Sequence, residues 1–337
     1  MKYLANATTL ILTILFLKTN AYSSSYISYN LKSQEIISSK NELAKIYPAS
    51  LTKIMTIYLV IDAIKIGQFS LYDKVRVPTE AANQPKTNAN LKAGQYIAIK
   101  DLIMLASGIS ANDAAYTLGY HVGGENIDSF IEIMNKKAGD LGLQNTHFAN
   151  PTGLHNSDQY SNAMDIVKLM ENFVKNHAGY LGMINSNNFI LNYQKYTSRN
   201  QIARNYKCIK AHKTGFTSAS GYNIVGYLSC GNHEIISAAI GFKNPQDRDT
   251  TFASNLNYAT AKTTESDQDF YTTREDIAEQ NSLALNVLKL NFGVLFYNSK
   301  FQQLYSVVNN SIAKQFTDQA KILDSYFYPS VKNTWFL

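Results

Sequence analysis

The spacing of apolar residues changes along the chain, and each change predicts a different element. Residues 26–45 alternate loosely between apolar and polar positions around a polar turn at 33–35, which indicates two short strands. Residues 50–65 instead carry their apolar side chains at helical spacing. Pro48 precedes this segment and Gly67 follows it, the usual asymmetry at the two ends of a helix. A helix is therefore expected over 50–65.

The middle of the chain is mainly helical in its spacing, and the part after Cys208 has the pattern of strands. Asp101 predicts the N-cap of one of the helices. The helical segments are 101–106, 112–121, 126–141 and 163–175. The strand segments are 75–77, 96–99, 209–216, 222–228 and 234–242. Because short polar turns separate the last three, they predict an antiparallel meander.

This order of strands, helices and strands predicts an α+β domain. We expect one antiparallel sheet that both ends of the domain help to build, flanked by helices and carrying an all-helical subdomain. Beyond residue 262 the sequence becomes rich in Ser, Thr, Asp, Glu and Gln, and helical spacing returns over 275–290 and 301–328. We therefore expect the main domain over 22–261 and a mainly helical extension over 262–337.

The first 21 residues have the pattern of a secretory signal peptide. Lys2 gives a positive start, residues 10–17 are almost entirely apolar, and a cleavage site is expected after Ala21. The apolar stretch over 4–17 is shorter than the roughly 20 residues that a membrane-spanning helix needs. The pattern predicts export, to the periplasm or to the outer face of the cytoplasmic membrane.

Composition excludes several classes of function. The net charge of +6 comes from 31 basic and 25 acidic residues that are scattered along the chain, so nucleic acid is not an expected partner. Cys208 and Cys230 lie outside any CxxC spacing; we expect two buried thiols, and an oxidising compartment leaves a disulfide open as the alternative. The six histidines show no metal-binding spacing, so we expect no metal and no other cofactor.

Three short motifs carry candidate chemistry, and the first lies at the start of the helix over 50–65. A spacing of three residues places the Ser50 hydroxyl and the Lys53 amine on one face of that helix. A lysine held away from water and near other cations loses its proton near neutral pH, and it can then act as the base for the serine. Alone, this pattern is common on solvated helices.

The second motif is Ser110-Ala111-Asn112, in a turn between two predicted helices. The hydroxyl of Ser110 can relay a proton, and the amide of Asn112 can bind a substrate carbonyl and hold the lysine. An ordinary N-cap for the helix that follows is the alternative interpretation.

The third motif is Lys213-Thr214-Gly215, inside a predicted strand, where a charge and a glycine are both unusual. An extended peptide that pairs with this edge explains both, because Gly215 leaves room for its backbone while Lys213 and Thr214 face its carboxylate. An edge strand protected by a lysine is the alternative.

Together, and in these structural contexts, the motifs resemble those of the serine D,D-peptidases, the low-molecular-mass penicillin-binding proteins, whose signature is known. The similarity covers roughly 22–260 and is carried by 48–56, 110–115, 159–161 with Asp165, 213–217 and 219–223. The resemblance implies a β-lactamase/D,D-peptidase-like fold and a D-alanyl-D-alanine carboxypeptidase that trims peptidoglycan stem peptides and is acylated by β-lactam antibiotics.

The resemblance also implies roles for individual residues. Ser50 would be the nucleophile and Lys53 the general base. Ser110 and Asn112 would relay protons and anchor the substrate. The backbone N–H groups of Ser50 and Phe216 would form the oxyanion hole. The residues implied to bind the substrate are Lys213, Thr214, Gly215, Phe216, Arg248 and Arg199, the two arginines as bidentate partners of its carboxylate.

The chain also departs from this family. No β-rich C-terminal domain is evident after residue 262, and aromatic residues at 326–328 and 335–337 suggest at most a peripheral membrane contact. Two other functions stay open. A serine β-lactamase would need a base for deacylation, but Glu132 is expected on a helix surface and Ala111 occupies the middle of the second motif. A catalytically idle wall-binding protein on the same fold is the other.

Overall fold

The computed structural model describes residues 24–263, except 186–187, 192–193, 199–205 and 207. The chain divides into two compact units, Met1–Phe270 and Tyr271–Leu337, and every described residue belongs to the first. The signal peptide, the helices expected over 275–290 and 301–328, and the aromatic C-terminus lie outside the described residues. The domain boundaries given above stay predictions.

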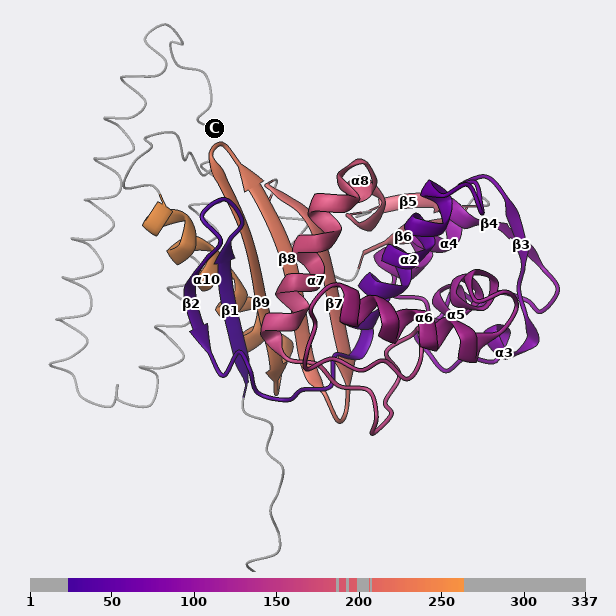
Figure 1. The fold of residues 1–337 in the computed structure, drawn as a ribbon, viewed down its shortest axis with the longest axis horizontal. Coiled ribbons are helices and arrows are strands. Elements are labelled where there is room, and N and C mark those ends of the chain that lie inside the picture. The colour runs from indigo at the N-terminus through magenta and orange to yellow at the C-terminus, as the bar shows by residue number, and fades with distance from the viewer. Residues whose placement is uncertain (1–23, 186–187, 192–193, 199–205, 207, 264–337) are drawn as a thin grey trace, which may run out of the picture. The chain divides into compact units, whose positions relative to one another are not determined.

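A five-stranded antiparallel sheet forms one layer of the molecule (Figure 1). Its order is β2-β1-β9-β8-β7, so that the two ends of the domain meet where β1 pairs with β9. This confirms a sheet built from both ends of the domain. The strands are β1 (Ser25–Asn30), β2 (Glu35–Lys40), β7 (Ile209–Thr217), β8 (Gly221–Cys230) and β9 (His233–Phe242).

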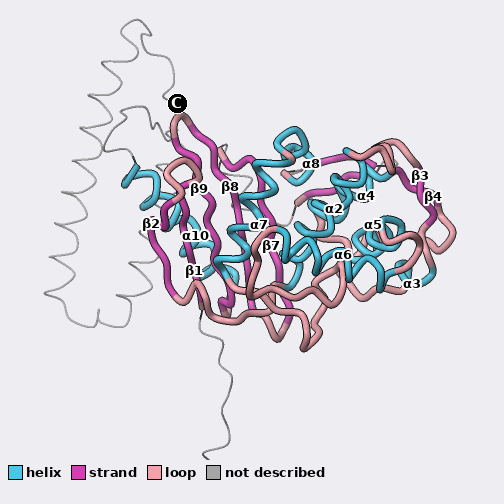
Figure 2. The backbone as a smooth tube through the Cα atoms, in the orientation of Figure 1, coloured by secondary structure: helices cyan, strands magenta, loops and turns pink. Residues whose placement is uncertain are grey.

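Helices cover both faces of this sheet. The side chains of β9 show this, because they alternate between two apolar clusters. Ile236 and Ala238 belong to the apolar core under most of the helices, whereas Ile235 and Ala239 belong to a second cluster with Phe252 on α10 (Pro245–Thr263). Successive side chains of a strand point to opposite faces, so both faces of β9 are buried. Figure 2 shows most of the helices on one side of the sheet and α10 on the other.

The helices and short strands complete the domain. The segment expected as one helix over 50–65 consists of a 3-10 turn, η1 (Ala49–Thr52), followed by α2 (Lys53–Lys65). The other helices are α3 (Thr79–Ala82), α4 (Ile99–Gly108), α5 (Asn112–Val122), α6 (Ile127–Asp140), α7 (Ala163–Asn176), η2 (Ala178–Tyr180) and α8 (Leu181–Ile184). Two small ladders pair β3 (Lys74–Arg76) with β4 (Tyr96–Ala98) and β5 (Asn188–Leu191) with β6 (Gln194–Thr197).

Two expectations about elements and covalent structure were wrong, and one long helix was not predicted. Asp101 is not an N-cap, because α4 begins at Ile99 and its N-cap is Ala98. Helix α10 was not expected, since its segment is rich in Thr, Asn and Asp, which disfavour helix interiors. Cys208 and Cys230 form a disulfide and are not two buried thiols, because β7 and β8 bring their Cα atoms to 5.2 Å.

No helix among the described residues has both the length and the apolar composition needed to cross a membrane. Helix α2 is instead surrounded by protein, and most of its side chains are buried.

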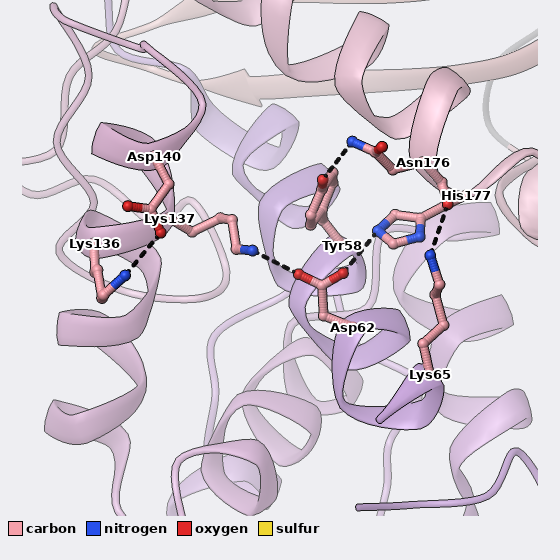
Figure 3. A network of polar contacts seen from close by, with 8 residues as sticks. All are labelled: Tyr58, Asp62, Lys65, Lys136, Lys137, Asp140, Asn176 and His177. Carbon is pink, nitrogen blue, oxygen red and sulfur yellow. Dashed lines mark hydrogen bonds and ion pairs between the residues drawn. The ribbon is translucent and has the colours of Figure 1, made fainter. Parts of the chain in front are cut away.

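A polar network fixes the C-terminal end of α2 against α6 and α7 (Figure 3). One carboxylate oxygen of Asp62 lies 2.8 Å from Lys137 Nζ, and the other lies 3.3 Å from Nε2 of the buried His177. The His177 ring packs edge-on against Tyr58, with 4.2 Å between ring centroids. Burial alone would raise the pKa of Asp62, but hydrogen bonds from His177 and Lys137 outweigh it and lower this pKa.

Asp62→Asn should therefore lower the free energy of unfolding at pH 7 by about 1 to 2 kcal/mol, since a charged partner is lost at a partly exposed site. Because the folded-state pKa of Asp62 is lowered, its contribution is present above the unfolded-state pKa and is lost as the pH falls through the folded-state pKa. Urea denaturation at pH 7 and in acid checks this. Asp140→Asn, in the exposed pair with Lys136, is the control and should change nothing measurable. A deficit of Asp62→Asn that is equally large in acid would contradict the assignment.

Candidate active site

Ser50 and Lys53 lie at the junction of η1 and α2. The 3-10 turn begins at Ala49, which has a left-handed backbone (φ 48°), and Ser50 is its second residue. Lys53 Nζ lies 3.1 Å from Ser50 Oγ, as the spacing of three residues predicted. The structure thus brings the candidate nucleophile and the candidate base into contact.

Lys53 is fully buried, which is rare for a lysine. Its Nζ donates to Asn112 Oδ1 at 2.7 Å and to the backbone carbonyl of Thr152 at 2.5 Å. Burial and the nearby charge of Lys213 hold the pKa of Lys53 well below its usual range, against the opposing effect of Asp113. An amine of this kind is available as a base near neutral pH.

The second motif lies where α4 ends and α5 begins. Ser110 has a left-handed backbone (φ 62°), and Asn112 opens α5 with its side chain 4% exposed. The N-cap of α5 is Ala111, so the Asn112 side chain does not cap this helix. Instead, Asn112 Nδ2 donates to the Pro85 carbonyl at 2.9 Å, and Asn112 Oδ1 accepts from Lys53 Nζ. This geometry favours the site interpretation of Asn112 over the N-cap interpretation.

Strand β7 supplies the third motif at the edge of the sheet. Lys213 is 3% exposed, and its Nζ donates to Ser110 Oγ at 3.0 Å, which joins the second and third motifs. Thr214 is half-buried, and the Phe216 side chain is 51% exposed. Among the described residues, no strand pairs with the outer edge of β7.

The structure gives a reason for Gly215 that the sequence did not predict. A Cβ at this position would lie 2.9 Å from the backbone nitrogen of Ser50 and 3.2 Å from the Ala49 side chain. The backbone that Gly215 admits is therefore that of the chain's own η1. The glycine allows β7 to lie directly against the nucleophile.

The two arginines that were expected to bind the substrate carboxylate are Arg248 and Arg199. Arg248 lies in the first turn of α10; it is 8% exposed, and its Nε donates to Asp249 Oδ1 at 2.6 Å. Burial raises the pKa of Asp249, and the pairing with Arg248 opposes this rise. Arg199 lies outside the described residues. Contact of either arginine with a substrate stays a prediction.

Sequence reasoning missed the loop that supplies the Thr152 carbonyl. Gly153 has a left-handed backbone (φ 81°), and a Cβ there would lie 1.9 Å from the Ala49 carbonyl oxygen. The segment 150–153 is recognisable in sequence as a turn, since it contains Asn, Pro and Gly. Thr152 and Lys53 are 99 residues apart in the sequence, so local residue spacing could not predict their contact.

A hydroxyl beside a buried amine, a second hydroxyl beside a second lysine, and the outer strand of a sheet are the parts of a serine acyl-transfer site. A model of the D-alanyl-D-alanine carboxypeptidase family, peptidase S11, matches residues 17–244 of this chain, and this range includes all three motifs. The chain belongs to the D-alanyl-D-alanine carboxypeptidase family.

Individual carboxypeptidases and a solved structure agree with this assignment. D-alanyl-D-alanine carboxypeptidase DacF of Bacillus subtilis is 29% identical over 67% of this chain and 59% of its own length. DacA of Haemophilus influenzae is 30% identical over 79% of this chain and 70% of its own length. The crystal structure of penicillin binding protein 5 from Haemophilus influenzae superposes with a TM-score of 0.67 at 30% identity, over 70% of each chain. The match to DacF thus spans less than two thirds of that relative.

Proposed function

We propose that the chain is a serine-type D-alanyl-D-alanine carboxypeptidase that removes the terminal D-Ala from peptidoglycan stem peptides through an acyl-enzyme on Ser50. The observation that carries this proposal is the buried Lys53, whose Nζ lies within 3.1 Å of Ser50 Oγ and is held by Asn112 and Thr152.

Burial and the nearby charge of Lys213 favour the neutral form of Lys53, and its contacts orient that form as the base. A neutral amine has two hydrogens and one lone pair. The Asn112 amide oxygen and the Thr152 carbonyl accept hydrogen bonds and cannot donate them, so they take the two hydrogens. The lone pair is then directed at the third neighbour, the Ser50 hydroxyl, whose proton it can accept.

The rest of the reaction follows from this arrangement. As Lys53 takes the proton, Ser50 Oγ attacks the carbonyl carbon of the penultimate D-Ala, and the backbone N–H groups of Ser50 and Phe216 stabilise the oxyanion. The C–N bond breaks, and the departing amine of the terminal D-Ala takes a proton from Lys53 through the Ser110 hydroxyl. Water then attacks the ester, which releases the shortened peptide and returns a proton to Ser50 Oγ.

Penicillin labelling tests the proposal directly. A penicillin presents its lactam carbonyl as the same acyl centre, and the Haemophilus influenzae protein of similar fold is named a penicillin-binding protein. We expect that labelling the full-length chain, digesting it and analysing the peptides by mass spectrometry gives one covalent adduct, on the peptide that contains Ser50. Ser50→Ala should give no adduct. An adduct on another residue, or none with folded protein, would refute the mechanism.

Recognition of the free carboxylate provides a second test, because Lys213 supplies a cation at the strand edge beside Ser110. Lys213→Ala should slow hydrolysis of a free-acid D-Ala-D-Ala peptide about 10 to 150 times more than that of its C-terminal amide, which has no charge to lose. Lys210→Ala, an exposed lysine on the same strand, is the control. Equal losses on both substrates would remove the carboxylate role from Lys213, and the same pair of substrates tests Arg248→Ala.

The N-terminal pattern of one lysine and an apolar run supports export, to the periplasm or to the outer face of the cytoplasmic membrane. Stem peptides of the cell wall are accessible there, and a peripheral membrane contact through the aromatic C-terminus is part of the same proposal.

A β-lactamase is a weaker candidate than a carboxypeptidase. Glu132, the acid that such an enzyme could have used for deacylation, is exposed on α6, as the sequence predicted. A catalytically idle wall-binding protein would not need a buried lysine in contact with a serine, and the labelling experiment separates it from an enzyme.

A further inference from the structure

The loop over 149–154 is held by the side chain of Asn150, and one of its hydrogen bonds goes to the peptide unit between Thr152 and Gly153. Asn150 Oδ1 accepts from the backbone N–H of Gly153 at 2.8 Å, from that of Thr152 at 3.2 Å, and from the Thr152 hydroxyl at 2.9 Å. Asn150 Nδ2 donates to the Leu154 carbonyl at 3.0 Å. The amide of Asn150 thus closes the turn on itself.

The peptide unit between Thr152 and Gly153 connects this side chain to Lys53. A peptide unit is planar, and in the trans form its N–H and C=O groups point in opposite directions. The N–H end of this plane belongs to Gly153 and is held by Asn150, whereas the C=O end belongs to Thr152 and accepts from Lys53 Nζ at 2.5 Å. Fixing one end therefore fixes the direction of the other.

We propose that Asn150 is a positioning residue for acylation, which aims the Thr152 carbonyl at the Lys53 amine and so directs the lone pair of that amine at Ser50. This inference rests on the function proposed above. Without the carbonyl, the amine can rotate about its Cε–Nζ bond, and the lone pair faces Ser50 for only part of the time. Hydrogen bonds at the two ends of one peptide unit also polarise each other, which strengthens the contact with Lys53.

Other contacts of the loop hold its flanks and leave this task to Asn150. Gln159, 2% exposed, accepts from the backbone N–H groups of Ala149 and Asn150 at 3.2 and 3.1 Å, and Thr56 Oγ1 donates to the Pro151 carbonyl at 2.7 Å. These contacts anchor the chain before Thr152. Substitution of Asn150 should therefore release one peptide plane while its neighbours stay in place.

The experiment compares Asn150→Ala, Asn150→Asp and the control Asn156→Ala in the full-length chain. Asn156 is exposed two residues beyond this loop and accepts from the Asp158 backbone N–H, away from Lys53. The measurement is the second-order rate constant of acylation by a fluorescent penicillin across pH, with the melting temperature of each variant. Wild-type protein that is not acylated would refute the proposed function itself, whereas differences between variants decide the role of Asn150.

We expect Asn150→Ala to lower the plateau rate about 10- to 100-fold, since a misplacement of about 1 Å near a reacting group costs up to this factor. Asn156→Ala should keep the wild-type rate. Asn150→Asp keeps an acceptor for all three donors and loses only the bond to the Leu154 carbonyl, which lies beyond the Thr152–Gly153 peptide unit, so it should keep most of the plateau rate. Its added negative charge favours the ammonium form of Lys53, as Asp113 does and as Lys213 opposes, so the acid limb of the profile should move to higher pH.

Two results would overturn the inference. One is an Asn150→Ala variant that loses melting temperature but is acylated at the wild-type rate, which is the behaviour of a purely structural residue. The other is an Asn150→Asp variant that folds but has lost the plateau rate, since it keeps the acceptor for the Gly153 N–H, and this variant decides the question alone if Asn150→Ala does not fold.

Discussion

Lys53→Met should reduce acylation by penicillin about 10²- to 10⁴-fold, the usual contribution of a general base. Methionine fills a similar apolar volume, so a cavity does not complicate the comparison as it would with alanine. Lys65→Met, at the exposed end of the same helix, is the control and should be acylated like the wild type. Near-normal labelling of Lys53→Met would show that another group takes the proton from Ser50.

Lys53→Met should also change how the free energy of unfolding depends on pH. Because the pKa of Lys53 is lowered in the folded state, the unfolded chain binds more protons between the folded-state and unfolded-state pKa values of this lysine. Wild-type stability therefore gains a rising component with pH across that window, and Lys53→Met should lack it. Urea denaturation at several pH values from neutral to alkaline measures this slope, and equal slopes in the two proteins would contradict a neutral buried amine.

Gly153→Ala should be the most damaging small substitution in the site. An added Cβ would lie 1.9 Å from the Ala49 carbonyl, and the backbone at this position is left-handed (φ 81°). Overpacking and backbone strain together predict a loss of about 2 to 5 kcal/mol in the free energy of unfolding. Since the clash is with the residue before Ser50, acylation of the folded fraction should fall as well.

Gly124→Ala separates the two causes of that loss. Gly124 has a similar backbone (φ 71°), but nothing lies within 4 Å of its hypothetical Cβ. It should cost only the strain term, about 1 to 2 kcal/mol, and leave acylation unchanged. Chemical denaturation and penicillin labelling of both variants check this. Equal destabilisation by the two substitutions would mean that the contact between Gly153 and Ala49 is not tight in solution.

Local patterns were sufficient to predict the elements that carry the three motifs. Ser50 and Lys53 are one helical turn apart, so their contact follows from helix geometry once the helix is recognised. Lys213 lies in the first strand of a meander whose turns are marked by Gly221 and Gly231, and the predicted meander matches β7, β8 and β9 closely. These inferences needed no knowledge of long-range contacts.

Contacts between distant residues could not be predicted in this way. The Thr152 carbonyl on Lys53, the pairing of Arg248 with Asp249 inside α10, and the approach of Gly215 to Ser50 all depend on how finished elements pack. Helix α10 was missed for a related reason, because burial of Phe252 and Leu256 against the sheet stabilises a segment of weak helix propensity. Periodicity shows which face of an element is apolar but not what covers it.

The disulfide between Cys208 and Cys230 spans the hairpin that carries Lys213. The stability of a protein sample therefore depends on whether this bond has formed during its preparation. A crosslink over this chain separation contributes about 3 kcal/mol in the chain-entropy model, more than many single substitutions remove. Material from a reducing bacterial cytosol would begin without this bond, whereas secreted material would have it. Two preparations of one sequence can thus differ more than a mutant and its parent, and a count of free thiols should accompany every rate and melting curve.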